Sequence, residues 1–304
     1  MYYVIREKQN IGEHFLKVVR ESGRLEKLRE ASTIILKPNI SGNLNWDNHS
    51  ITGLYLLKEV LAAVLRSNKD ALVYIGESDS RQGRYAYRKF QRLNFPDCLK
   101  IETSEIGRVK MLDLTRDNLK KAKDGKFVFF NKRNGFPSFS KKLLNADFLI
   151  SISNVKTHMM CKYTGACKNL FGCLPDSDKS IYHGYIHKVI HDVNLLIKPD
   201  ICIVDGFRGM QGNGPTKGES VDFRFMVFSD NSVEADFTAA GLIGINPMKV
   251  KYLKLISMAC GKYKELRIPD AVFNARKPDL KFRIKFRLKG ILAAAGYKIL
   301  RHGI

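Results

Sequence analysis

The chain of 304 residues is short of acidic side chains and of long apolar runs, and it contains a single tryptophan. Its 30 Asp and Glu residues stand against 52 Lys and Arg residues, and the net charge of +22 favours anionic partners such as nucleic acid, anionic lipid or a phosphorylated substrate. No stretch reaches the roughly 18 apolar residues that a membrane-spanning helix needs. The first residues lack the apolar core of a signal peptide, so a cytoplasmic location is expected.

Six cysteines are too few and too scattered for a disulfide scaffold, which fits a reducing compartment. Cys161, Cys167 and Cys173 are six residues apart, whereas iron–sulfur motifs space their cysteines about three to five residues apart. We interpret these three as packing residues, and a built-in 4Fe–4S cluster is not expected.

Strand-like and helix-like patterns alternate along the chain, which predicts an α/β fold. Short apolar, β-branched runs predict strands at residues 33–36, 72–76, 148–153, 201–205 and 223–228. The first four are apolar on both faces, as in parallel strands covered by helices. Helical spacing is found at residues 54–65 (after the expected cap Thr52), 186–197, 234–243 and 250–260. We therefore predict a doubly wound, mainly parallel sheet with helices on both faces, in two lobes with the site between them.

The boundaries follow from a basic, glycine-punctuated stretch at residues 116–142, where a hairpin is expected around residues 127–130. We predict an N-terminal lobe at 1–120, a connector at 121–142 and a second lobe at 143–265 that carries the main motifs. Residues 266–304 form a separate basic and apolar tail.

Polar residues follow four of the predicted strands, and ligands bind beyond the carboxyl ends of strands in open α/β sheets. Lys37 and Asn39 follow the first strand, Glu77 the second, residues 154–158 the third and Asp205 the fourth. We expect a cleft there, in which Lys37, Asn39 and Glu77 bind a cofactor and Asp205 takes part in catalysis.

The segment from residue 154 to residue 192 holds the main catalytic candidates. Lys156 and His158 would face the same side of an extended strand. Lys168 and Asn169 lie in an apolar, glycine-containing stretch, where burial would lower the pKa of the lysine and free its amine as nucleophile, base or cofactor tether. The alternative is a lysine that keeps its ammonium in water. We predict that these four residues are catalytic, with His158 transferring a proton.

His183, His187 and His191 are spaced four residues apart, so a helix would place them on one side. Imidazoles at this spacing are good ligands for zinc, nickel or iron. We predict a metal site from these histidines, with Asp192 orienting His183 or His187. A surface stripe of histidines is the alternative.

A glycine-rich loop, GMQGNGPTKG, occupies residues 209–218. Its backbone amides would cradle a phosphate or carboxylate, so Gly212, Asn213, Gly214 and Lys217 are candidate cofactor-binding residues. A plain structural turn is the alternative.

The tail from Arg276 to Ile304 has nine Lys or Arg residues and one acid, a net charge of +8. Residues 280–289 alternate strictly between apolar and cationic side chains. An extended segment would have one apolar and one cationic face, whereas this stretch as a helix has no single apolar face. Either the tail lies on an anionic inner membrane face, or it forms a last strand and helix with a solvated basic face.

A basic, aromatic cluster at residues 81–92 would suit single-stranded nucleic acid. Nucleic-acid binding is not favoured, however, because the chain has no recognised nucleic-acid motif.

Several motifs together resemble the domain-of-unknown-function 362 family over about residues 33 to 260. They are LKPNI at 36–40, GES at 76–78, LLNADFLISISNVKTH at 143–158, GACKNLFGCLP at 165–175, YHG at 182–184, IVDGFRGMQGNGPTKG at 203–218, and Glu234–Asp236 with LIG at 242–244. Members of that family are often joined to a ferredoxin-like module with two 4Fe–4S clusters. Because this chain has no CxxCxxC run near its C-terminus, the resemblance implies a separate ferredoxin as partner.

The order His158, Lys168, His183 also resembles the active-site segment of the lactate racemase family. The resemblance implies proton transfer at His158, a nickel-pincer nucleotide carried covalently by Lys168, and nickel ligation by His183. Two features differ: Gly165-Ala166-Cys167 replaces the diglycine before the lysine, and His49 is the only early candidate for a second catalytic histidine.

We therefore expect an enzyme that acts on a small anionic substrate by racemase-like, metal-assisted proton or hydride transfer. The alternative is an accessory protein at the inner membrane face that partners a ferredoxin.

Overall fold

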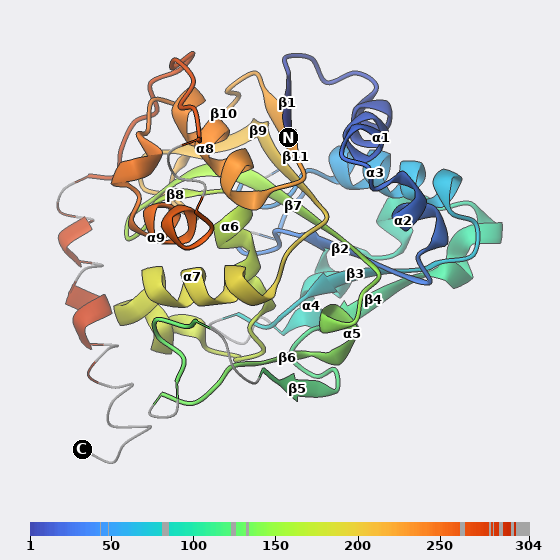
Figure 1. The fold of residues 1–304 in the computed structure, drawn as a ribbon, viewed down its shortest axis with the longest axis horizontal. Helices are drawn as coiled ribbons and strands as arrows, with labels where there is room; N and C mark the ends of the chain where they lie inside the picture. Colours follow the sequence, from blue (N-terminus) through green and yellow to red (C-terminus); the bar gives the residue numbers. More distant parts are fainter. Residues whose placement is uncertain are drawn as a thin grey trace.

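The computed structural model describes residues 1–42, 44–47, 49–80, 85–122, 126–131, 134–261, 265–279, 281, 283–285, 288–292 and 295. Within these residues a nine-stranded sheet forms the centre of the molecule (Figure 1), with strand order β1-β11-β9-β7-β2-β3-β4, while β8 pairs with β7 and β10 with β9. Its strands are β1 (Tyr2–Ile5), β2 (Thr33–Pro38), β3 (Leu72–Glu77), β4 (Val109–Asp113), β7 (Phe148–His158), β8 (Lys162–Thr164), β9 (Ile201–Gln211), β10 (Glu219–Val221) and β11 (Met226–Ser229).

Helices cover both faces of the sheet, as predicted (Figure 1). The α-helices are α1 (Ile11–Glu21), α2 (Leu25–Glu30), α3 (Leu54–Ser67), α4 (Ala86–Arg92), α5 (Lys141–Leu144), α6 (Ala166–Asn169), α7 (Ile186–Leu196), α8 (Ser232–Leu242) and α9 (Lys251–Ala259). Short 3-10 helices are η1 (Asp97–Leu99), η2 (Thr103–Arg108), η3 (Leu170–Cys173), η4 (Lys179–Tyr185) and η5 (Pro247–Lys249). One apolar core lies under α1 and α3, and the other lies under α6, α7, α8 and α9. Cys161, Cys167 and Cys173 are fully buried in the second core, as expected of packing residues.

The middle of the sheet is parallel, because β2 pairs in parallel with both β3 and β7, and β7 pairs in parallel with β9. This confirms the doubly wound α/β fold. The antiparallel strands β1 and β11 complete one edge. Neither β1 nor α1 was predicted. Thr52 does not cap α3: its hydroxyl accepts a hydrogen bond from the amide of Asn39 and donates one to the carbonyl of Ile152.

Strands β7 and β9 are longer than predicted, because short partners extend them. The hairpin partner β8 pairs Lys156 with Thr164 and His158 with Lys162, and β10 pairs with the end of β9. Residues 154–158 and Asp205 therefore lie within strands rather than in strand-end turns.

The predicted lobes 1–120 and 143–265 contribute strands to one sheet, in which β2 and β7 are direct neighbours. The predicted connector begins and ends in a small antiparallel sheet of β5 (Leu119–Lys121) and β6 (Ser138–Ser140). The strand pairing in this region therefore lies outside residues 127–130, where a hairpin was expected. Phe129 and Phe130 are buried in the second core instead.

The tail is attached along the body of the protein. The amides of Val272 and Phe273 both donate to the carbonyl of Leu242, at 3.0 Å. The described residues from 281 onward are helical, and the amide of Arg283 donates to the carbonyl of Asp279 at 2.9 Å. The alternative of a last strand at 280–289 is therefore wrong for the described part of that segment. No helix among the described residues is long and apolar enough to cross a membrane. Residues 81–84 of the basic, aromatic cluster lie outside the described residues.

Candidate functional site

The β7–β8 hairpin and the turn after it bring Lys168 close to His158. Asp236 of α8 holds this turn, because its carboxylate accepts the backbone amides of Ala166 at 2.7 Å and of Cys167 at 2.9 Å. Burial raises the pKa of Asp236 to about 7. Asp236 was not predicted as a site residue, because Glu234–Asp236 served in the sequence only as one of the family motifs.

His158 is held as a neutral ring. Its Nδ1 accepts hydrogen bonds from the amides of Met160 and Cys161, at 3.1 and 3.2 Å, so the proton is on Nε2. Burial lowers the pKa of His158 well below its usual value, and the charges of Lys168 and nearby histidines lower it further. In this state Nε2–H can donate a hydrogen bond, but the ring has no free nitrogen with which to accept a proton from a substrate.

Lys168 is partly buried, and its ammonium has no hydrogen bond or ion pair within the described part of the chain. Its Nζ lies 5.7 Å from the centre of the Phe171 ring. Burial lowers the pKa of Lys168, which increases the fraction of uncharged, reactive amine at neutral pH.

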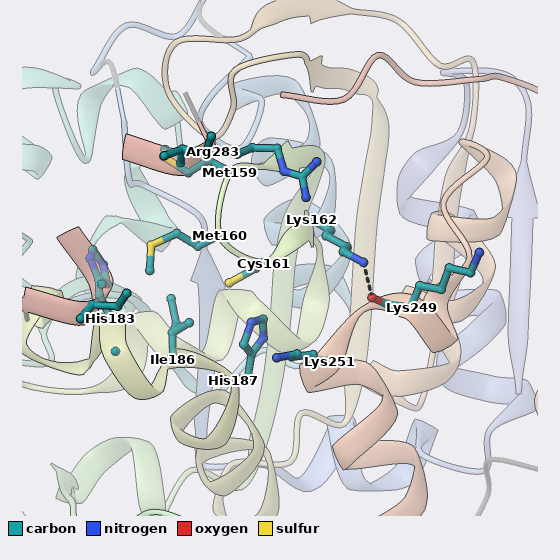
Figure 2. Close-up of a pocket in the computed structure, with 14 residues that line it drawn as sticks. Met159, Met160, Cys161, Lys162, His183, Ile186, His187, Lys249, Lys251 and Arg283 are labelled. Atoms are coloured by element: carbon teal, nitrogen blue, oxygen red, sulfur yellow. Dashed lines mark hydrogen bonds between the residues drawn. The ribbon is translucent and has the colours of Figure 1, made fainter. Parts of the chain in front are cut away.

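A pocket of about 550 Å³ lies at the β7–β8 turn, whose residues 159–162 follow His158 directly (Figure 2). Met160 and Cys161, whose backbone amides donate to His158, belong to its wall. His183 and His187 line the same space, together with four cationic side chains. Those cations are Lys162, Lys249, Lys251 and Arg283. No acid is among the described lining residues, so the pocket is suited to an anion.

This cationic wall was not predicted from the sequence. Lys162 comes opposite His158 through β7–β8 pairing, and its ammonium donates to the carbonyl of Lys249 at 2.9 Å (Figure 2). Lys251 begins α9, and Arg283 comes from the tail. These residues are distant in sequence, and only the tertiary fold brings them together.

The predicted histidine trio is divided. His183 and His187 line the pocket, but His191 is buried and its Nδ1 lies 2.7 Å from Asp192. Asp192 also accepts the amides of residues 128–130, so it secures the connector and does not orient His183 or His187. Among the described residues no three His, Cys, Asp or Glu side chains are arranged to hold a metal ion.

His187 is a neutral ring at physiological pH. It stacks on Tyr252 with 6.3 Å between ring centres, and within the described residues its buried Nδ1 has no hydrogen-bond partner. Burial and the charge of Lys251 lower the pKa of His187 to about 4.

The remaining catalytic candidates have structural partners. Asn169 donates from its amide to the carbonyl of Lys37 and to the hydroxyl of Ser151, and so ties α6 to the sheet. Asp205 accepts the hydroxyl of Tyr55 at 2.8 Å on the α3 side of the sheet, opposite α6. Burial raises the pKa of Asp205 to about 6.

Lys156 and His49 also have partners of their own. The ammonium of Lys156 donates to the carbonyl of Ser50 at 2.6 Å. Burial lowers the pKa of Lys156 to about 7. His49 lies 3.1 Å from the carbonyl of Gly209.

Lys37 and Glu77 form a buried ion pair, with 3.1 Å between Nζ and Oε2. Lys89 approaches the other oxygen of Glu77 at 3.9 Å. Asn39 accepts the hydroxyl of Ser41. These contacts bind the ends of β2 and β3 to each other, so the three residues predicted to hold a cofactor have structural partners instead.

The glycine-rich loop binds the tail. The amide of Gly212 donates to the carbonyl of Arg276 at 2.7 Å, and Asn213 exchanges two hydrogen bonds with Asp279. Gly214 lies so close to Thr157 that a Cβ would come 2.1 Å from its carbonyl oxygen. Lys217 is exposed. The structural-turn alternative therefore describes the loop better than a phosphate cradle.

The lactate racemase apoprotein of Thermoanaerobacterium thermosaccharolyticum has a similar structure, with a TM-score of 0.50 over 75% of this chain and 54% of that one. Its sequence identity is 11%, so the likeness concerns the fold alone. A thylakoid-associated protein of Synechocystis sp. is 28% identical over 118 residues, which are 36% of this chain and 37% of that protein. The model of one family matches residues 34–241. The chain therefore belongs to the family described as Domain of unknown function (DUF362).

Proposed function

We propose that this protein is an enzyme that binds a small anionic substrate in the pocket at the β7–β8 turn and uses Lys168 as its reactive amine. The observation that carries the proposal is a lysine whose pKa is lowered by burial and whose amine has no hydrogen bond or ion pair in the described part of the chain. Its charge acts on Cys161 and His187, which belong to the wall of the cation-lined pocket. Lys162, Lys251 and Arg283 would hold the anionic group of the substrate. The Nε2–H of His158 would donate a hydrogen bond to a substrate oxygen, and Lys168 would accept a proton or bond covalently.

In this proposal His158 donates a hydrogen bond and Lys168 exchanges the proton, whereas proton transfer by His158 was expected from the sequence. A ring whose Nδ1 is occupied by two amide donors polarises an oxygen, as neutral imidazoles do in other enzymes. The low pKa favours the same neutral state. Proton exchange then falls to the amine of Lys168, whose neutral form is favoured by burial.

A nickel-pincer nucleotide, which the racemase resemblance implies, fits the residues present. Lys168 has an amine without a partner for a covalent tether, and His183 lies on the wall of the pocket as a ligand for the metal. The cationic side chains would neutralise the phosphate of a nucleotide. When bound, such a group would supply an electrophilic centre for proton or hydride transfer.

Pyridoxal 5′-phosphate, an anionic aldehyde, tests the proposal independently of the natural substrate. After reduction with borohydride and peptide mapping, Lys168 should be labelled faster at neutral pH than the exposed Lys188, because burial lowers the pKa of Lys168 and so increases its fraction of neutral amine. Inorganic phosphate should slow this labelling. In the Lys168→Arg variant the preferred label should disappear, whereas Lys188→Arg should leave it unchanged. Labelling spread evenly over the surface lysines would rule the proposal out.

A further inference from the structure

The helical tail has an apolar stripe that faces solvent. Ile284, Leu288, Ile291 and Leu292 are 50, 56, 58 and 71% exposed. Their spacing of four, three and one residues places them on one side of a helix. Exposed large apolar residues are otherwise scattered over the described part of the chain, so this concentration within nine residues needs a partner.

The body of the protein leaves these four residues at least half exposed, and its closest contacts with the tail involve other residues. Gly290 is buried, and a Cβ there would lie 3.2 Å from Cε of Met160 and 3.6 Å from the carbonyl oxygen of His183. Arg283 lines the pocket, and Asn213 holds Asp279 just before the helix. Gly290 and Arg283 lie away from the stripe on a helical projection, so the docked helix turns Leu288 and Leu292 outward, while Ile284 and Ile291 lie at the edge of the pocket.

Cations surround the stripe. Lys281, Arg283, Lys285 and Lys289 lie on the same helix, and the tail from Arg276 carries a net charge of +8. A second copy of a chain with a charge of +22 would bring like charges together. An anionic bilayer complements both the apolar stripe and the cations that flank it.

We propose that the described helical residues of the tail, 281, 283–285 and 288–292, belong to an interfacial helix that inserts Ile284, Leu288, Ile291 and Leu292 into an anionic lipid surface. Arg283, Ile284 and Ile291 also line the pocket. When the helix is bound to lipid, the opening of the pocket would therefore lie at the lipid surface. The helix lies outside residues 34–241, the segment that the family model matches.

Vesicle sedimentation of the full chain tests the proposal. The protein should pellet with vesicles of equal parts phosphatidylglycerol and phosphatidylcholine, and should stay in the supernatant with phosphatidylcholine alone. The double variant Leu288→Gln/Leu292→Gln keeps the charge and should lower the partition coefficient by at least about tenfold. The matched control is Met258→Gln, which alters a 53% exposed residue of α9 and should leave binding unchanged.

Charge is tested separately. Replacing Lys281, Lys285 and Lys289 together by Gln should weaken binding, whereas the same change at the exposed Lys69, Lys198 and Lys254 should weaken it far less. Equal loss in the two triple variants would indicate adsorption by net charge and would overturn the proposal. Wild-type binding by the Leu288→Gln/Leu292→Gln variant would do the same. So would a lipid-free dimer, seen by sedimentation velocity, that this variant abolishes. Thermal unfolding should be unchanged, since the altered residues are exposed.

Discussion

Gly165 and Asp236 are in such close contact that a Cβ on the glycine would lie 2.1 Å from Oδ1 of the aspartate. The same Cβ would lie 2.4 Å from the hydroxyl of Tyr163. This contact lets the aspartate reach the amides of Ala166 and Cys167 and so fixes the turn that carries Lys168. The small residue at this position is therefore a requirement of the site and of the core behind it.

Gly165→Ala should lower the free energy of unfolding by about 2–4 kcal/mol, because buried atoms must move apart. Urea unfolding followed by circular dichroism measures the change. Gly107→Ala is the matched control, since its Cβ would meet nothing within 4 Å, and it should change stability by less than about 0.5 kcal/mol. Equal effects of the two substitutions would show that the contact with Asp236 is not tight.

The sequence predicted the fold well because strand and helix periods are local. The strands β2 and β3, the starts of β7 and β9, and the helices α3, α7, α8 and α9 were expected close to their observed bounds. The extensions of β7 and β9 were not, since they depend on pairing with β8 and β10.

The candidate site was predicted in part for the same reason. His158 and Lys168 lie ten residues apart, and the intervening hairpin brings them together. The cationic wall from Lys251 and Arg283 was missed because it is built by distant segments. The apolar stripe of the tail was missed because it becomes continuous only when Ile291 and Leu292 join Ile284 and Leu288, beyond the alternating stretch 280–289.

Glu77→Gln should be strongly destabilising. Burial raises the pKa of Glu77, but the charges of Lys37 and Lys89 outweigh it and hold that pKa below its usual value. Without the carboxylate, two buried ammonium groups would lose their counter-charge, which costs about 3–5 kcal/mol of unfolding free energy. Chemical denaturation should show this loss, while Glu59→Gln on the exposed side of α3 should be nearly neutral. If Glu77→Gln left the free energy of unfolding nearly unchanged, the buried ion pair would be screened by water.

Lys156 should make stability depend on pH. Its pKa falls from 10.5 to about 7 on burial, so between these values the unfolded chain holds a proton that the folded chain lacks. Unfolding free energy therefore rises with pH through this window, by up to about 1.4 kcal/mol per pH unit from this residue. Lys156→Met should remove that rise and should stabilise the protein most at pH values below the window.

Urea unfolding of wild type and Lys156→Met at pH 7 and pH 9 measures the difference between the two slopes. Lys188→Met, on the exposed side of α7, should keep the wild-type slope. Parallel pH profiles for wild type and Lys156→Met would show that Lys156 stays charged in the folded protein.

Lys251 should contribute both to anion binding and to the neutral state of His187. It lines the pocket, and its charge adds to burial in lowering the pKa of His187 to about 4. Lys251→Gln should weaken inorganic phosphate binding by about threefold to fivefold, the size expected for one exposed charge contact. The same substitution should raise the pKa of His187, because one source of repulsion is removed.

Calorimetric titration with phosphate and NMR titration of the His187 ring give the two readouts. Lys254→Gln is the matched control, since Lys254 is exposed on the same helix but is absent from the described pocket wall. If phosphate binding falls equally in both variants, the anion is attracted by net charge and not held in the pocket. If binding falls only in Lys251→Gln while the pKa of His187 rises, the cation and the ring share one site, as the geometry of α7 and α9 requires.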